Sequence, residues 1–230
     1  MKKKYCVIGL GDLGKSIAIT LSETGAEVIA IDKNMEEVEE IKDKVTMPVR
    51  LDSTDKRALK NEGIDKVDAA IVAIGPDDFE STILTSVLLL EIGVKKVIAR
   101  AASSLQLNIL TKLGVHQVVV PDVQIARQIV ALVSSEEIID SIPLGDDYSI
   151  IYVKVPKIFV GKSLLELDLR IRYNINLITI KRKYPTDSRD EGSEKFVERI
   201  YGVPTASTTL EPDDILIVLG RDKDIKKIID

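Results

Sequence analysis

The chain has 230 residues, 45% of them hydrophobic and 30% charged, as expected of a globular protein with a substantial core. The net charge of −5 argues against a general nucleic-acid binder, because contacts with phosphates need a basic surface. The single cysteine excludes an internal disulfide and a multi-cysteine metal site. No apolar run approaches the roughly 18–20 residues that span a bilayer, and the N-terminal run is too short for a signal peptide, so we expect a soluble intracellular protein.

In the first 120 residues, short β-rich apolar runs alternate with segments of helical periodicity, the pattern of βαβ units around a parallel sheet. The helices are marked by apolar residues four apart, such as Leu13, Ile17 and Leu21, and by a capping pattern at Asn34 and Glu37. The sequence therefore predicts an α/β fold with a Rossmann-type doubly wound parallel sheet. Six strands are expected, at residues 5–8, 28–31, 47–51, 69–73, 96–99 and 117–120.

A glycine-rich loop, Gly9-Leu10-Gly11-Asp12-Leu13-Gly14, directly follows the first expected strand and opens the first helix. In such a loop the first glycine allows the tight turn, the second lets a pyrophosphate approach the backbone, and the third lets helix and strand pack closely. The helix N-terminus adds unpaired N–H groups and a favourable dipole for an anion. We therefore predict a nucleotide site here; the alternative is a flavodoxin-like turn that binds nothing.

Acidic residues follow the second and third expected strands. Asp32 lies 18 residues beyond Gly14, where a carboxylate accepts hydrogen bonds from ribose hydroxyls and would repel a 2′-phosphate, which disfavours NADP. Asp52-Ser53-Thr54 follows the third strand and is placed to meet the adenine or its ribose. The alternative is that this segment caps the helix that starts at Asp55, and the two functions are compatible because they use different atoms.

Residues that could carry catalysis are scarce. A dehydrogenase needs a proton donor or acceptor beside the nicotinamide, but the single histidine, His116, precedes the sixth expected strand and is interpreted as structural. Cys6 lies inside the first strand, where a small buried hydrophobe is expected. The sequence has no Ser-His-Asp, zinc-spacing or P-loop pattern. We therefore expect binding without turnover; the alternative is a small NAD-dependent oxidoreductase.

The remainder of the chain has a different character. Pro121 opens an expected helix to about residue 139 that is apolar over much of its circumference, so it needs cover from its own sheet or also from a partner subunit. Residues 141–148 are expected to form a linker, because Pro, Gly and paired Asp break regular structure. We place one domain at 1–140 and a small α+β domain at 141–230. In the second we expect strands at 149–155, 177–183, 196–203 and 215–219, a short helix at 163–170, a polar loop at 184–195 and a terminal helix from Asp222.

Several blocks, in the right order across both domains, resemble the RCK (also called KTN) regulatory proteins of the Ktr and Trk potassium transporters, in particular the peripheral Ktr subunits. The resemblance implies a cytosolic gating subunit, peripheral at the inner face of the cell membrane, whose homodimers assemble into an octameric ring beneath an integral membrane potassium transporter subunit. Adenine nucleotides bound in the first domain would change the shape of the ring, ATP or ADP in the Ktr branch and NAD or NADH in the Trk branch. A gating domain severed from its own channel pore would instead require transmembrane segments upstream, which the start at Met1 argues against. The matching segments are 5–11, 52–55, 70–75, 164–170, 173–180 and 214–220.

The resemblance implies further residues for the nucleotide site. Arg100 matches a basic position near the terminal phosphates. Asp122 matches an acidic position that can help to hold a divalent cation against the nucleotide at the dimer interface; the alternative is charge complementarity at a helix N-terminus. The other positions that it implies are Lys33, Ala73, Ile74 and Gly75.

One departure from the family pattern concerns Asp12. Ktr subunits usually carry Arg within the glycine loop to meet the γ-phosphate, and this chain has a carboxylate there. The carboxylate should repel a triphosphate by about 1–3 kcal/mol if its charge lies within several Å and is partly desolvated. NAD(H), ADP or AMP are therefore expected as ligands besides ATP, and a bridging cation would offset the repulsion.

The second domain resembles the TrkA-C module, which in Ktr subunits of some bacteria binds cyclic di-AMP across a dimer interface. Arg170 would contact a phosphate bidentately, Asn176 a base or the backbone, and apolar side chains the adenine faces. The alternative is structural, because the leucines concerned fit ordinary core positions. The implied positions are Leu164, Leu165, Arg170, Asn176, Leu177 and Pro204.

Overall fold

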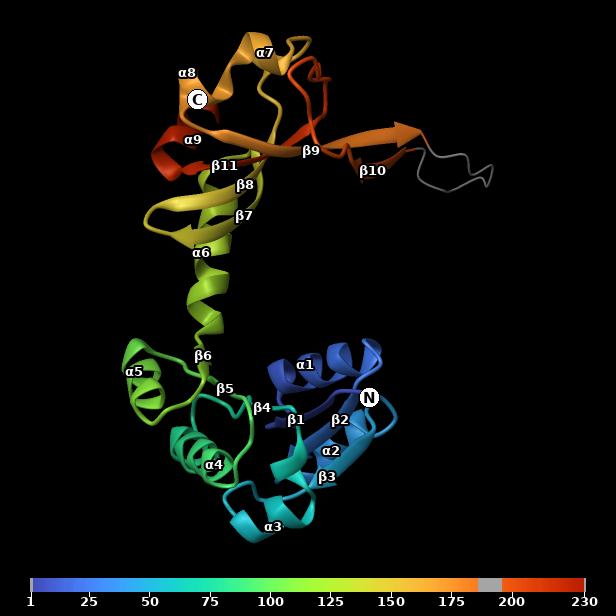
Figure 1. Cartoon of the computed structure of the whole chain (residues 1–230), viewed down its shortest axis with the longest axis vertical. Helices are drawn as coiled ribbons and strands as arrows, with labels where there is room; N and C mark the ends of the chain where they lie inside the picture. The colour runs from blue at the N-terminus through green and yellow to red at the C-terminus, as the bar shows by residue number, and fades with distance from the viewer. Residues whose placement is uncertain (1, 186–195, 230) are drawn as a thin grey trace. The chain divides into compact units, whose positions relative to one another are not determined.

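The computed structural model describes residues 2–185 and 196–229 and divides the chain into two compact units, Met1–Asp122 and Val123–Asp230 (Figure 1). Each unit has its own sheet and its own core. In the part of the chain described, no helix is long and apolar enough to cross a membrane.

The first unit is built on a parallel six-stranded sheet with the order β3-β2-β1-β4-β5-β6. This order confirms the predicted Rossmann-type fold. The chain winds outward from β1 in one direction and then from β4 in the other, so the loops after β1 and β4 leave the sheet beside a crevice at the carboxyl ends of the strands. The strands are β1 (Lys4–Ile8), β2 (Glu27–Asp32), β3 (Met47–Arg50), β4 (Ala69–Val72), β5 (Val97–Arg100) and β6 (Gln117–Val119).

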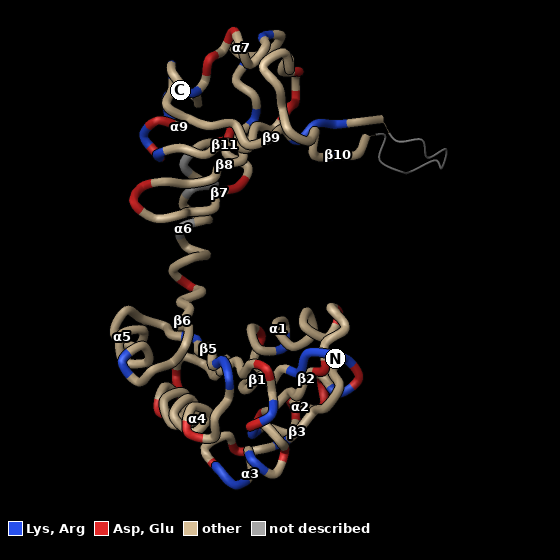
Figure 2. Tube along the Cα trace, viewed as in Figure 1, with Lys and Arg blue, Asp and Glu red and all other residues tan. Residues whose placement is uncertain are grey.

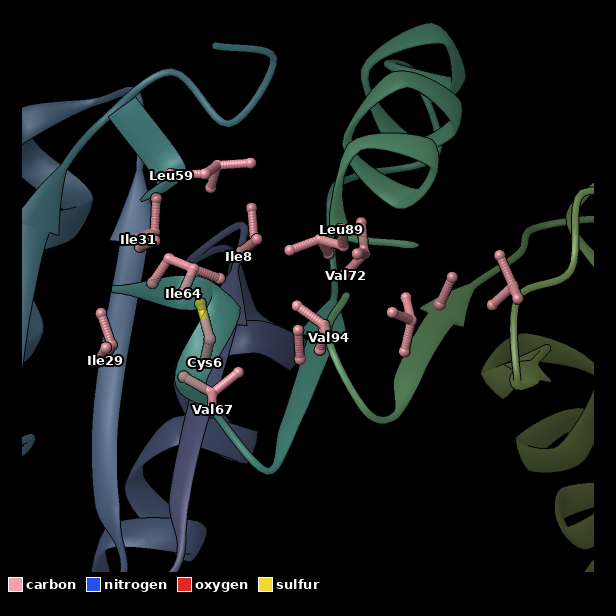
Figure 3. Packing of buried hydrophobic residues seen from close by; sticks show 14 of the residues in the cluster. Cys6, Ile8, Ile29, Ile31, Leu59, Ile64, Val67, Val72, Leu89 and Val94 are labelled. Atoms are coloured by element: carbon pink, nitrogen blue, oxygen red, sulfur yellow. The ribbon is translucent and has the colours of Figure 1, made fainter. Parts of the chain in front are cut away.

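Alternation along β1 supplies both faces of this sheet. Val7 packs into a cluster with residues of α1 and α2, whereas Cys6 and Ile8 pack on the opposite face with residues such as Leu59 of α3 and Leu89 of α4 (Figure 3). The strands of a doubly wound sheet are covered on both sides and therefore read as continuous apolar runs. The helices of this unit are α1 (Asp12–Glu23), α2 (Met35–Ile41), α3 (Lys56–Asn61), the 3-10 helix η1 (Ile64–Lys66), α4 (Phe79–Glu91) and α5 (Ser104–Lys112). The next helix, α6 (Pro121–Ser134), begins at the end of the first unit and belongs mostly to the second.

The second unit is an antiparallel five-stranded sheet with the order β10-β9-β11-β8-β7, packed against short helices. Its core includes Phe159, Leu216 and Val218. A basic stretch, Lys181–Lys183, lies on β9 beside β10 (Figure 2). The elements are β7 (Ile138–Gly145), β8 (Tyr148–Lys154), the 3-10 helix η2 (Lys157–Phe159), α7 (Leu164–Leu167), α8 (Leu169–Tyr173), β9 (Asn176–Pro185), β10 (Phe196–Ile200), β11 (Ile215–Arg221) and α9 (Asp222–Ile229).

The prediction of a linker at residues 141–148 is wrong. These residues form most of β7 and the turn into β8. The two strands pair antiparallel, from Ile138 opposite Val153 to Gly145 opposite Tyr148. The turn consists of Asp146 and Asp147, with φ of 51° and 60°, the left-handed backbone that a tight hairpin needs at both central residues and that Asp tolerates. Pro143 is compatible with this strand because β7 lies at the edge of the sheet, where proline is tolerated.

Several expected boundaries also move. Helix α6 ends at Ser134 rather than near residue 139, and the expected boundary at 140/141 falls inside β7. The short helix expected at 163–170 becomes α7 and α8, separated by Asp168 in a left-handed conformation (φ 44°). Strand β10 ends at Ile200 rather than at residue 203. Of the polar loop expected at 184–195, residues 184 and 185 belong to β9 and the rest lie outside the described residues.

Candidate functional site

A cleft lies at the carboxyl ends of the central strands, where the topology of the sheet places it. The cleft has a volume of about 200 Å³ and is open to solvent. The segments that follow β1, β2, β3 and β4 and the start of α4 all contribute to its walls. The lining residues are Ile8, Gly9, Gly11, Asp32, Lys33, Leu51, Asp52, Ser53, Ile74, Gly75, Asp78 and Ser81.

The three glycines of the loop differ in what surrounds them. Gly9 has φ of 90°, and a Cβ there would lie 2.7 Å from the backbone nitrogen of Ile74. A Cβ on Gly14 would lie 1.8 Å from the carbonyl oxygen of Gly9. At Gly11 an added Cβ would meet nothing within 4 Å. The fold itself therefore requires glycine at positions 9 and 14, whereas position 11 is open and borders the cleft.

Asp32, the last residue of β2, fastens the glycine loop to the strand. Its Oδ2 accepts a hydrogen bond from the backbone N–H of Leu10 at 2.7 Å, and its Oδ1 accepts one from the N–H of Asn34 at 2.8 Å. Each carboxylate oxygen has further acceptor capacity. Asp32 therefore orients the loop and can still accept a hydrogen bond from a group in the cleft.

An ion pair joins two walls of the cleft. Lys33, directly after β2, places its Nζ 2.9 Å from Oδ2 of Asp78, the N-cap of α4. This ammonium and a bond from Ser81 lower the pKa of Asp78 to about 2, and Asp78 raises the pKa of Lys33. Hydrogen bonds from Thr54 lower the pKa of Asp52 on the neighbouring wall.

The segment after β3 is held internally. Thr54 donates from its Oγ1 to Oδ1 of Asp52 at 2.7 Å, and the buried Ser53 hydroxyl lies 2.7 Å from that of Thr85 on α4. The N-cap of α3 is Asp55, whose side chain accepts from two backbone N–H groups. The alternative interpretation, that residues 52–54 cap this helix, is therefore wrong, because Asp55 has the capping geometry.

Other expected nucleotide contacts lie outside this lining. Arg100, at the end of β5, donates to Oδ2 of Asp122 in the first turn of α6 at 3.3 Å. The Arg100 side chain is 19% exposed, and its buried Nε has no hydrogen-bond partner. Asp12 is exposed in the first turn of α1. The remaining expected positions outside the lining are Leu13, Gly14, Thr54 and Ala73.

A metal site has little protein support. Within residues 2–185 and 196–229, no group of three or more His, Cys, Asp or Glu side chains is arranged to hold an ion. Asp122 faces the guanidinium of Arg100.

Both candidate reactive side chains have structural surroundings. Cys6 is fully buried in β1, and burial raises the pKa of its thiol far above the ordinary value. Nδ1 of His116 accepts a hydrogen bond from the backbone N–H of Val97 at 3.0 Å, which fixes the start of β5 beside the loop that precedes β6.

In the second unit, two of the expected ligand-binding residues touch. Nη2 of Arg170 donates to Oδ1 of Asn176 at 2.7 Å. Leu164 and Leu177 are partly buried against the core. Leu165 is 74% exposed, so its interpretation as a core residue is wrong. Pro204 is half-buried.

Comparison with known proteins shows to which family the chain belongs. The model of the TrkA-N domain matches residues 5–121. Ktr system potassium uptake protein C of Bacillus subtilis (strain 168) is 35% identical over 227 residues, which cover 99% of this chain and 96% of that protein. The chain belongs to the family of Ktr potassium uptake proteins. Ktr system potassium uptake protein A of the same organism is 30% identical over 225 residues, covering 98% and 95% of the two chains. This is the RCK-type regulatory family that the resemblance in the sequence had implied.

Solved structures agree with the fold of a Ktr-family protein. The GsuK RCK domain has a TM-score of 0.64 at 14% identity, and the match covers all of this chain and 48% of that one. The GsuK channel bound to NAD gives a TM-score of 0.65 at 15% identity, covering 100% of this chain and 40% of that chain. This Ktr-family chain therefore spans about half or less of the GsuK chains that it matches, and at this identity the likeness concerns the fold.

Four lining residues of this Ktr-family protein were not expected: the apolar Ile8 and Leu51, and the polar Asp78 and Ser81 at the start of α4. The available signal for the two polar residues was local: an Asp in the segment Gly75–Asp78, between an apolar strand and a helical pattern, is a typical N-cap. That pattern predicts a helix start, but it does not reveal that the capping carboxylate faces Lys33, which lies 45 residues away.

Proposed function

We propose that this chain is a nucleotide-binding regulatory subunit of a Ktr-type potassium transporter. The observation that carries the proposal is the glycine loop, fastened by Asp32 at the crevice of a doubly wound sheet. In this fold the crevice is where ligands bind. Because the family consists of potassium uptake proteins, binding in the cleft is proposed to regulate ion flux.

The ligand is proposed to be an adenine nucleotide. Open backbone at Gly11 and the N-terminus of α1 suit a phosphate group, and the free acceptor capacity of Asp32 suits ribose hydroxyls. Structures of GsuK have been solved bound to NAD and to ADP. NAD(H), ADP and AMP fit better than ATP, because Asp32, Asp52 and Asp78 line the cleft and Asp12 lies at its helix.

Arg100 is proposed to meet the terminal phosphate of a longer ligand. Its guanidinium is mostly buried, carries an unpartnered Nε, and is held by a single partner at 3.3 Å or more. A divalent cation at Asp122 would need phosphate oxygens to complete its coordination. The cation therefore belongs to the ligand complex rather than to the protein alone.

The cleft is proposed to bind without turnover. Its lining residues include neither histidine nor cysteine, and the pKa values of Asp52 and Asp78 are lowered, which keeps these carboxylates ionised and poor as general acids at neutral pH. A small NAD-dependent oxidoreductase is the competing function. NADH oxidation assayed with a panel of carbonyl substrates separates the two, since turnover that disappears in a Gly11→Ala variant would contradict a purely regulatory function.

Assembly and the second ligand follow the family. We propose a homodimer that builds an octameric ring on the cytoplasmic face of an integral membrane transporter subunit.

We also propose that the second unit binds cyclic di-AMP. The pair Arg170–Asn176 is exposed and has donors left over for a phosphate and a base, and the exposed Leu165 offers an apolar surface to an adenine.

Calorimetric titration of ATP, ADP, AMP and NADH, with and without Mg²⁺, tests the nucleotide site. Gly11→Ala is the informative variant: its backbone (φ −64°) accepts Ala, so the fold should persist, while the methyl group enters the space that a phosphate would use. We expect wild-type binding of at least one nucleotide to weaken by about tenfold or more in this variant, from the loss of charge-assisted backbone contacts. Unchanged affinity, with an unchanged melting temperature, would contradict the placement of the ligand.

A further inference from the structure

Lys33 directly follows Asp32, the acidic residue that ends β2. In nucleotide-binding sheets of this type, a carboxylate at that position accepts from the ribose 2′-hydroxyl, and a basic side chain nearby accommodates a 2′-phosphate instead. The chain therefore carries both devices side by side, Asp32 for the hydroxyl and Lys33 for the phosphate. Both line the cleft.

The amine of Lys33 is already engaged. Its Nζ lies 2.9 Å from Oδ2 of Asp78, which approaches from the opposite wall at the start of α4. Asp78 remains ionised at neutral pH, because Lys33 and Ser81 hold its pKa near 2. Among the described residues that line the cleft there are three carboxylates, on Asp32, Asp52 and Asp78, and one ammonium.

We infer that Asp78 is a specificity-determining residue, which excludes 2′-phosphorylated adenine nucleotides by occupying Lys33. A 2′-phosphate entering the cleft meets the carboxylates of Asp32 and Asp78, and it finds the neighbouring cation paired with one of them. A nucleotide whose ribose 2′-hydroxyl carries no phosphate needs no cation at this position, so the pairing of Lys33 with Asp78 does not affect its binding. This inference rests on the proposed nucleotide site and adds a selectivity that Asp32 alone does not provide.

The pair is well suited to a substitution test. The Lys33 side chain is 71% exposed, and an exposed ion pair contributes little to stability, so replacing either partner should leave the fold intact. Asp78→Asn also keeps the helix cap, because the amide oxygen of Asn can accept from the backbone N–H of Ser81 as the carboxylate does now. Asp77→Asn is a matched control, since Asp77 is the adjacent exposed acid and does not line the cleft.

The probes are 5′-AMP and adenosine 2′,5′-bisphosphate, which differ only in the 2′-phosphate. We would measure both dissociation constants for the full chain by calorimetry at neutral pH and low salt. In Asp78→Asn we expect the preference for 5′-AMP over the bisphosphate to fall by about tenfold, because one ammonium becomes available to the phosphate and one repelling charge is lost. In Asp77→Asn the preference should stay at the wild-type value.

A double variant assigns the gain to Lys33. Asp78→Asn combined with Lys33→Met removes the amine, so most of the gained affinity for the bisphosphate should disappear. The inference is overturned if wild-type chain binds 5′-AMP and the preference does not change in Asp78→Asn, if Asp77→Asn changes it equally, or if the double variant keeps the full gain. If wild-type chain binds neither probe nor NADH, the proposed nucleotide site fails together with the inference.

Discussion

Three glycines of one motif place different demands on the fold. Gly9 and Gly14 face backbone atoms at distances where no Cβ fits, whereas Gly11 faces open space. The sequence motif does not distinguish the three glycines from one another. Only the structure separates Gly9 and Gly14, which pack closely, from Gly11, which borders the cleft.

We therefore predict that Gly9→Ala and Gly14→Ala lower the stability of the first unit, by about 3 kcal/mol or more, because the backbone must move to relieve the contacts. Gly11→Ala should change the free energy of unfolding by less than about 1 kcal/mol. Urea denaturation followed by circular dichroism measures all three. Equal losses for Gly11→Ala and Gly14→Ala would contradict the packing described.

Asp32 shows how one carboxylate serves both fold and site. We predict that Asp32→Ala lowers the free energy of unfolding by about 1–3 kcal/mol, because the N–H groups of Leu10 and Asn34 lose their acceptor. The same variant should lose nucleotide binding even at temperatures where it is fully folded. Thermal denaturation with and without ADP measures both effects, and a melting temperature that still rises with ADP as in wild type would count against the ribose contact.

Among the elements, the first unit follows closely from the sequence and the second does so less. The six strands appear where apolar runs predict them. The signal is strongest in the central strands β1, β2 and β4, which are mostly buried and therefore nearly continuous in apolar residues. The β7–β8 hairpin was not predicted. Pro143, Gly145 and the Asp pair are typical of linkers, and the pairing that turns them into an edge strand and a tight turn involves residues outside that segment.

The site was predictable to the same extent. Residues that a local motif identifies, such as Gly9, Gly11 and Asp32, line the cleft. The ion pair between Lys33 and Asp78 was not predictable, because it joins segments 45 residues apart that meet only through the strand order.

In the second unit, a buried ion pair fastens β9 to the turn that precedes β11. The guanidinium of Arg182 donates to both carboxylate oxygens of Asp214 at 2.8 and 2.7 Å and to Glu211 at 2.7 Å. Asp214 is fully buried as a side chain, and Arg182 is 11% exposed. This bidentate geometry fixes the register of the two strands.

We predict that Asp214→Ala lowers the free energy of unfolding of the second unit by about 3–5 kcal/mol, because it leaves a nearly buried guanidinium without its main partner. Asp213→Asn is the control: Asp213 is exposed with φ of 67°, a conformation that Asn also accepts, so the change should cost less than about 0.5 kcal/mol. Urea denaturation followed at the second-unit transition measures both variants. Similar losses for the two would show that the Arg182 pair contributes nothing particular.

For the whole molecule, family and site lead to one account. The chain belongs to the Ktr potassium uptake proteins over nearly its full length, and its first unit carries the cleft that we propose binds a nucleotide. A regulatory subunit of this kind must transmit the state of the cleft to a transporter. The selectivity of the cleft would then decide which cellular nucleotide controls potassium flux.

Potassium flux through the cognate transporter in proteoliposomes tests this account most directly. With wild-type chain added, we expect flux to change by several-fold between the nucleotide-free state and saturation with whichever nucleotide binds in calorimetry. With the Gly11→Ala chain, flux should not respond to the same nucleotide. Flux that ignores nucleotide although the wild-type chain binds it, or that responds equally in Gly11→Ala, would contradict the account.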